Sequence, residues 1–241
     1  KEGFAEPDPT FDISGQDAAQ KTSILATLSF FKHAVIENIY FEGIDKVTPQ
    51  DINFGKQLEL ILKPLSVGQL SEDKITLGSF PAFVKEKSLL ASIENESNAV
   101  LMNAENVGET MYAGPGAGAK PTSNSVLSDI IDIATGKIFD YQKFVESPLA
   151  SSFENFSCDH YLRFIVSDEP GVVAKISTVL AANNLSIDNL IQNELDREDD
   201  AIPLVIVISN SKEKIMQNTI SDLQKLPEVK NSISHIRILD I

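Results

Sequence analysis

Residues 3–21, GFAEPDPTFDISGQDAAQK, bring together side chains that could transfer protons. Lys21 follows Asp17 by one helical turn, and Glu6 lies in the proline-rich loop before them. A lysine on a half-buried face beside fixed carboxylates can exchange protons near neutral pH, because desolvation lowers its pKa while the carboxylates raise it. The alternative interpretation is a solvated i,i+4 ion pair, with Asp17 in a capping box after Ser14.

The helix that must position this pair is predicted over residues 14–34, with Ser14 as its N-cap. At 100° per residue, Asp17 and Lys21 share a face with an apolar stripe, which we expect to be buried. The stripe consists of Ile24, Leu25, Leu28 and Phe31. The proton-transfer interpretation therefore expects Lys21 to be half-buried.

The rest of residues 1–136 is predicted to build a mixed or antiparallel sheet with helices. A second helix is predicted over residues 48–63, with Thr48 as its cap, and strand patterns follow up to residue 114. The glycine-rich loop AGPGAGAKP then leads into a helical pattern that ends at Gly136. Such a loop either makes an ordinary turn or lets its backbone approach a ligand closely, and it is not a G-x-G-x-x-G fingerprint.

Residues 159–241 show the clearest pattern, with strands and helices in the order βαββαβ. This order is typical of a ferredoxin-like unit, a four-stranded antiparallel sheet with two helices on one face. Residues 137–158 lack a clear period and are interpreted as a linker. The sequence therefore predicts an α+β protein of two domains.

Composition excludes several classes of function. The 241 residues carry 20 Lys and Arg against 35 Asp and Glu, and this net charge of -15 disfavours nucleic acid and anionic membrane surfaces as partners. The single cysteine, Cys158, excludes an internal disulfide framework and fits the cytoplasm. The histidines His33, His160 and His235 have no ligand spacing, so no metal site is expected.

Two motifs carry a resemblance to a known family. The opening segment GFAEPDPTFDISGQDAAQK resembles the signature of homoserine dehydrogenases, and YAGPGAGAKPTSNSVLSDIIDIA resembles the second motif of that family, in the expected order. In the second motif Ala113 and Ala119 replace an aromatic residue and a glycine that are often found there. The family places the first motif at the start of its catalytic domain, after a dinucleotide-binding Rossmann domain. Because the chain begins at Lys1 without an initiator methionine, we expect it to be a fragment that lacks that domain.

The resemblance implies roles for individual residues. Lys21 would exchange a proton with the substrate oxygen during hydride transfer, and Glu6 and Asp17 would bind the substrate. Gly116 and Gly118 would face the cofactor, NADP or NAD, which the absent domain would bind for the most part. The choice between NADH and NADPH would depend on that domain as well.

The last unit resembles an ACT domain, a small-molecule regulatory module, through SDEPGVVAKISTVLAANNLSIDNLIQ. The resemblance implies that Asp168, Gly171 and Ser186 hold an amino-acid effector such as threonine, where free amides at a helix N-terminus suit a carboxylate. The alternative gives these residues structural roles: Asp168 caps a helix, Gly171 allows tight packing and Ser186 starts a strand.

The sequence is therefore interpreted as the catalytic and ACT domains (residues 1–136 and 159–241) of a homoserine dehydrogenase. The resemblance implies interconversion of homoserine and aspartate semialdehyde in threonine, methionine and isoleucine biosynthesis, in a homodimer or homotetramer. This chain alone is predicted to be inactive. The alternative is a non-catalytic amino-acid sensor, in which the ACT unit binds its ligand and the first domain only dimerises.

Overall fold

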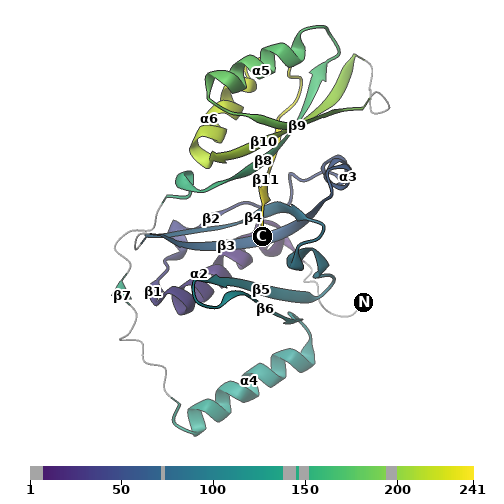
Figure 1. Ribbon diagram of the computed structural model, residues 1–241. Coiled ribbons are helices and arrows are strands. Elements are labelled where there is room, and N and C mark those ends of the chain that lie inside the picture. Colours follow the sequence, from purple (N-terminus) through teal and green to yellow (C-terminus); the bar gives the residue numbers. More distant parts are fainter. Residues whose placement is uncertain (1–7, 72–73, 138–144, 147–151, 194–199) are drawn as a thin grey trace.

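The computed structural model describes residues 8–71, 74–137, 145–146, 152–193 and 200–241. Figure 1 shows that helices α5 and α6 lie together at one end of the molecule and that α4 lies at the opposite end. The α-helices are α1 (Thr10–Ile13), α2 (Gln16–Phe30), α3 (Pro49–Gln57), α4 (Ala119–Ala134), α5 (Val172–Ala182) and α6 (Glu213–Leu223). No helix in the described ranges is both long enough and apolar enough to cross a membrane.

One sheet runs through both halves of the chain, in the strand order β2-β4-β11-β8-β10-β9, with β3 paired to β4 as well. Its strands are β2 (Tyr40–Phe41), β3 (Leu60–Ser71), β4 (Lys74–Lys85), β8 (Ser157–Ser167), β9 (Ile187–Gln192), β10 (Ala201–Lys212) and β11 (Ser234–Leu239). The two halves join where β11 pairs in parallel with β4 and antiparallel with β8. The α+β class and the mixed sheet are confirmed.

The second half has the predicted βαββαβ order, with its four strands in the order β11-β8-β10-β9. Alternate residues of β8, such as Leu162 and Phe164, pack in one buried cluster with side chains of α5 and α6. The other face of the same strands is covered by the first half, because Phe54 of α3 packs there with Tyr161 and Val207. The ACT-like unit is therefore enclosed by α3 on the face that its own helices leave open.

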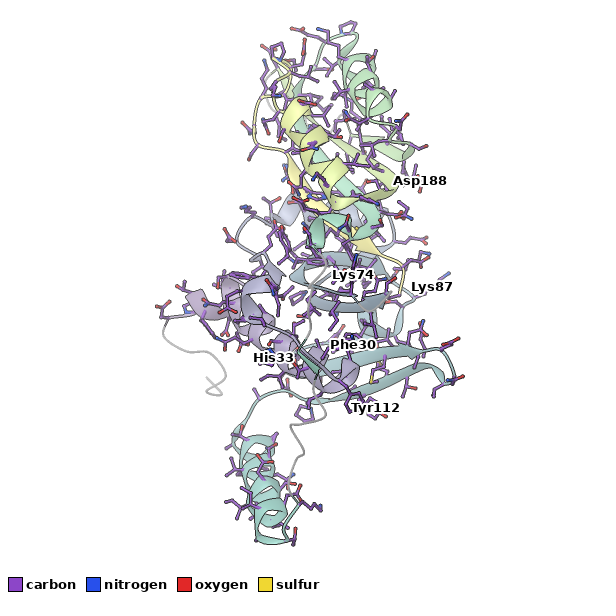
Figure 2. All side chains as sticks on the ribbon, turned by 90° about the vertical axis from the view of Figure 1, so that its left-hand side faces the viewer. Phe30, His33, Lys74, Lys87, Tyr112 and Asp188 are labelled. Atoms are coloured by element: carbon purple, nitrogen blue, oxygen red, sulfur yellow. The ribbon has the colours of Figure 1, made fainter. Side chains whose placement is uncertain are left out.

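Two elements of the first half extend away from this sheet. Strands β5 (Ser97–Ala104) and β6 (Gly108–Pro115) form a separate antiparallel hairpin, and α4 follows it with no buried residue. Figure 2, in which Tyr112 marks the hairpin, shows α4 standing apart from the rest of the chain. The apolar residues that predicted α4 are more than half exposed: Val126, Leu127, Ile130, Ile131 and Ile133.

Three local predictions need correction. Ser14 does not cap α2, because the chain first makes the short helix α1, and Gly15 is the N-cap with φ +80°. The helix predicted over residues 48–63 ends at Gln57, where Glu59 with φ +58° turns the chain into β3. The last part of the predicted linker contributes to a core, since Phe153 and Phe156 are buried. The short strands β1 (Lys32–His33) and β7 (Val145–Glu146) pair in parallel.

Candidate functional site

Lys21 and Asp17 form the ion pair that the spacing predicts, on the exposed side of α2. The Nζ atom of Lys21 lies 2.7 Å from Oδ2 of Asp17, and the two side chains are 64 % and 31 % exposed. The expectation that Lys21 is half-buried in this chain is therefore wrong. Glu6, the other predicted substrate ligand, lies outside the described residues.

The face of α2 that packs inward is the opposite of the one that the sequence favours. The apolar stripe is 43 to 62 % exposed, whereas Ala19, Thr22 and Ala26 are buried. These small side chains belong to the face that packs on the sheet, beside Ile75 and Leu77 of β4. Asp17 and Lys21 share the exposed stripe, so they remain open to any molecule that covers it.

The N-terminus of α2 is fixed by close backbone packing. A Cβ atom on Gly15 would lie 2.9 Å from the backbone oxygen of Glu42, so the two backbones are in direct contact. The amide of Ile44 donates to the oxygen of Ile13 at 3.0 Å. Before this turn, Asp8 accepts hydrogen bonds from the hydroxyl and the backbone amide of Thr10, which hold the pKa of Asp8 below its usual value.

The glycine-rich loop lies between β6 and α4. Gly118 is the N-cap of α4 and has φ +114°. Any residue with a Cβ atom would be strained in this conformation. A Cβ atom on Gly116 would fall 2.0 Å from the side-chain nitrogen of Asn98, so this position needs glycine for packing. Within the described part of the chain, no side chain accepts a hydrogen bond at the N-cap of α4, so the amides of its first turn have no side-chain acceptor there.

The ACT-like half contains a hollow of about 310 Å³ at the turn between β8 and α5. Asp168 and Gly171 line it, and Gly171 has φ +94° at the N-cap of α5. Ser186 is exposed and is not among the lining residues, whereas Gln192 of β9 is. The structure thus brings two of the three predicted effector residues together and adds Gln192, which carries no local sequence signal.

Two of the histidines that are distant in sequence are in contact. Nδ1 of His160 lies 2.9 Å from Nε2 of His235, and Nε2 of His160 lies 3.1 Å from the carbonyl oxygen of Ser211. The carbonyl can only accept, so Nε2 of neutral His160 carries the proton and its Nδ1 accepts from His235. Burial lowers the pKa of both histidines.

Glu213 completes a set of three possible metal ligands with this pair, all within 4.8 Å of one another. Its carboxylate is already engaged, since Arg237 donates from Nε at 3.0 Å and from Nη2 at 2.6 Å. A cation would have to displace these bonds beside a guanidinium group. The geometry therefore favours a hydrogen-bonded network over a metal centre.

Two buried arginines join the halves of the chain, and sequence reasoning missed both. Arg163 of β8 donates from Nε to Asp51 of α3 at 2.7 Å. Arg237 of β11 is fully buried and donates from Nη1 to Glu42 at 2.9 Å. The only available signal was an arginine inside each apolar strand pattern.

Comparison with known proteins identifies the family. Residues 1–131 match the family model described as homoserine dehydrogenase, and residues 160–228 match that of the ACT domain. The chain belongs to the homoserine dehydrogenase family. Its fold therefore combines the catalytic domain of that oxidoreductase family with an ACT domain.

Individual homoserine dehydrogenases agree with this assignment. The chain is 36 % identical to one from Helicobacter pylori over 98 % of this chain and 56 % of that protein. It is 35 % identical to one from Bacillus subtilis over 95 % of this chain and 55 % of that protein. The crystal structure of a homoserine dehydrogenase from Thiobacillus denitrificans superposes with a TM-score of 0.89 at 31 % identity, over 99 % of this chain and 56 % of that one. The chain thus spans a little over half the length of these relatives.

Proposed function

We propose that this chain supplies the substrate-binding and regulatory part of a homoserine dehydrogenase, which interconverts homoserine and aspartate semialdehyde with NAD or NADP. The observation that carries the proposal is the 2.7 Å pair of Lys21 and Asp17 on α2, in a chain of this family. In this role the enzyme serves the formation of threonine, methionine and isoleucine.

In the proposed reaction Lys21 handles the proton of the substrate oxygen. Oxidation of homoserine requires loss of that proton as hydride leaves the carbinol carbon, and the Lys21 amine accepts it when it is unprotonated. Asp17 fixes the lysine through the ion pair and offers a carboxylate oxygen to the substrate. Glu6 supplies a second acidic group for the substrate ammonium.

The dinucleotide, when bound, accepts the hydride. The loop at Gly116 and Gly118 fits part of such a ligand, because its backbone is constrained by φ +114° at Gly118 and the N-terminus of α4 has no side-chain cap. Free amides at a helix N-terminus suit a phosphate group. A separate nucleotide-binding domain holds most of the cofactor, and the exposed apolar face of α4 packs against it.

The hollow at Asp168 and Gly171 is the proposed effector site of the ACT domain. The first-turn amides of α5 suit the carboxylate of an amino acid, and threonine is the proposed effector. Isothermal titration calorimetry with millimolar threonine tests this assignment. Absence of heat would remove threonine as the effector without affecting the catalytic proposal.

The enzyme is proposed to act as a homodimer or homotetramer. Several apolar side chains of the β5–β6 hairpin are exposed, including Val100, Met102 and Tyr112, and they would be covered by a second copy. Light scattering measures the assembly directly, and a monomer at micromolar concentration would contradict it.

The catalytic proposal is tested with the complete gene product that contains these 241 residues. Purified protein should reduce NAD or NADP only when homoserine is present. Lys21→Met should lower kcat by about 10²-fold or more, as expected for loss of a proton-transfer group. Lys120→Met, which removes a different lysine beside the glycine loop, serves as the control and should act on the cofactor KM instead.

Two results would contradict this proposal. A gene product that binds amino acids but reduces no dinucleotide would favour the amino-acid sensor. An unchanged kcat in Lys21→Met would end the catalytic role of Lys21. The 241-residue chain alone should show neither tight dinucleotide binding nor turnover.

A further inference from the structure

Arg237 occupies a rigid, buried position between the two halves of the chain. Its guanidinium group lies 4.6 to 5.4 Å from the ring centres of Tyr40, Phe80 and Phe153. Its Nε and Nη2 atoms bind Glu213 of α6 in a bidentate pair. The Nη1 group, which Glu213 does not bind, is directed to the first half of the chain.

That Nη1 group donates to Oε2 of Glu42 at 2.9 Å. The hydroxyl of Tyr40 donates to the same oxygen at 2.9 Å and accepts from Nη2 of Arg237 at 3.0 Å. These three groups form a closed triangle of hydrogen bonds. Residue 42 therefore has little freedom to move relative to the ACT half.

The N-terminus of α2 packs against the backbone of Glu42. Gly15 is in direct contact with it, because an added Cβ would meet the Glu42 oxygen at 2.9 Å and the carbonyl carbon at 3.4 Å. The amide of Glu42 is tied to the oxygen of Ser79 on β4 at 2.9 Å. Asp17 follows Gly15 by two residues and Lys21 by six, on the first two turns of α2.

We propose that Arg237 and Glu42 are positioning residues for Lys21 and Asp17: the ACT half, through Arg237, fixes the backbone at Glu42 against which the N-terminus of α2 is set. The proposal rests on the function assigned above to Lys21. It gives the ACT half a direct structural role in the alignment of the reacting groups, whether or not an effector is bound.

The charge of Arg237 supports its proposed role as a positioning residue. Burial disfavours the charged form of Arg237, but the hydrogen bonds and charge of Glu213 outweigh this effect and raise the pKa of Arg237. Arg237 thus stays cationic and paired with Glu213 when Glu42 is changed. Removal of the Glu42 side chain should then loosen the contact to α2 without leaving a buried carboxylate unpaired.

The test compares Glu42→Ala with Glu42→Gln in the complete gene product. Alanine removes both hydrogen bonds, whereas the glutamine oxygen can still accept from Arg237 and Tyr40. A displacement of about 1 Å in a reacting group can cost up to about 10²-fold in rate, so we expect a fall in kcat of about tenfold for alanine and less than about threefold for glutamine. The KM for the dinucleotide should change less than about twofold, because Lys21 acts on the proton of the substrate.

Homoserine deuterated at the carbinol carbon provides a second readout. Misalignment slows the chemical step, so the isotope effect on kcat should rise above that of the wild type. A variant that is merely unstable contains fewer active molecules, which lowers the apparent kcat but leaves the isotope effect and both KM values unchanged. All rates are therefore expressed per folded molecule, from circular dichroism.

Two control variants separate positioning from general stability. Asp240→Ala removes the exposed pair with Lys85, which also links the two halves, and should leave kcat unchanged. Asp51→Ala breaks the buried pair with Arg163 at α3 and should lower stability without the loss of kcat per folded molecule. A fall of less than threefold in Glu42→Ala, or an equal fall in Asp51→Ala, would overturn the proposal.

Hydrogen exchange separates this proposal from the proposed function. The amide of Ala19 donates to the oxygen of Gly15 in the first turn of α2, at 3.0 Å. Its exchange should be faster in Glu42→Ala than in the wild type, even if the gene product proves to have no dehydrogenase activity. Unchanged exchange together with unchanged kcat would show that Glu42 does not position α2.

Discussion

Replacement of Asp51 by alanine should destabilise the protein more than most single substitutions. The carboxylate is fully buried and accepts hydrogen bonds from Arg163 at 2.7 and 3.1 Å, from Tyr161 at 3.2 Å and from the backbone and hydroxyl of Thr48 at 2.9 and 2.7 Å. Burial raises the pKa of Asp51, but the hydrogen bonds from Arg163 and Thr48 outweigh it and hold the pKa below its usual value. Asp51 is therefore ionised near neutral pH.

The magnitude follows from what alanine leaves behind. Arg163 is itself buried, and a buried ion pair that loses one partner costs about 3–5 kcal/mol because the other charge remains uncompensated. Loss of the capping box at Thr48 adds about 1 kcal/mol. We therefore expect Asp51→Ala to lower the free energy of unfolding by about 4–6 kcal/mol.

Urea unfolding followed by circular dichroism measures this change. The double variant Asp51→Ala with Arg163→Met should be less destabilised than Asp51→Ala alone, because the orphaned charge is gone. The exposed pair of Lys85 and Asp240 is the control, and Asp240→Ala should cost less than about 1 kcal/mol. A loss below about 1 kcal/mol in Asp51→Ala, or simple additivity in the double variant, would refute the argument.

Three further predictions follow from other parts of the structure. Burial lowers the pKa of His160 and His235 below the usual 6.5, so the unfolded chain binds protons more readily than the folded chain. The free energy of unfolding should therefore fall as the pH drops below 6.5. Urea unfolding at pH 5.5 and 7.5 should show a smaller fall in His235→Gln than in the wild type. Gly118→Ala should strain the φ +114° turn and raise the dinucleotide KM of the gene product, while the urea midpoint changes little because α4 is exposed. Gly15→Ala should lower both the melting temperature and kcat, since its Cβ would press on the Glu42 backbone; an unchanged kcat would contradict the tight packing of α2.

The ACT half was predictable from sequence because each of its elements has a strong local signal. The uninterrupted apolar run at residues 202–208 fits a buried strand, and the helical spacing of Val172, Ile176 and Leu180 marks the inward face of α5. The cap of α3 was predictable too, because Thr48 and Pro49 have well-defined preferences at a helix start.

The orientation of α2 was not predictable in the same way. The helical period places the large apolar residues of α2 on one face and its small residues on another. The prediction assumed that the face with the large apolar side chains is the buried one. In the structure Ala19 and Ala26 are buried instead. The position of Lys21 relative to solvent depended on this choice, so the prediction of a half-buried lysine failed with it.

The ion pairs of the two buried arginines could not be predicted, for a different reason. Asp51 and Arg163 are 112 residues apart in the chain, and Glu42 and Arg237 are 195 residues apart. No local pattern specifies such partners, because the pairing arises only when β11 closes the sheet against β4. Neither arginine was therefore singled out from the sequence.

The continuous sheet has a consequence for protein engineering. Truncation after the first half would remove β11 from β4, which would expose the edge of β4 at residues 82–84 and the apolar side of α3 that packs on Tyr161. The shortened chain should therefore aggregate. The proposed effector site is better removed by single substitutions that fill the hollow beside Gln192 and leave every strand in place.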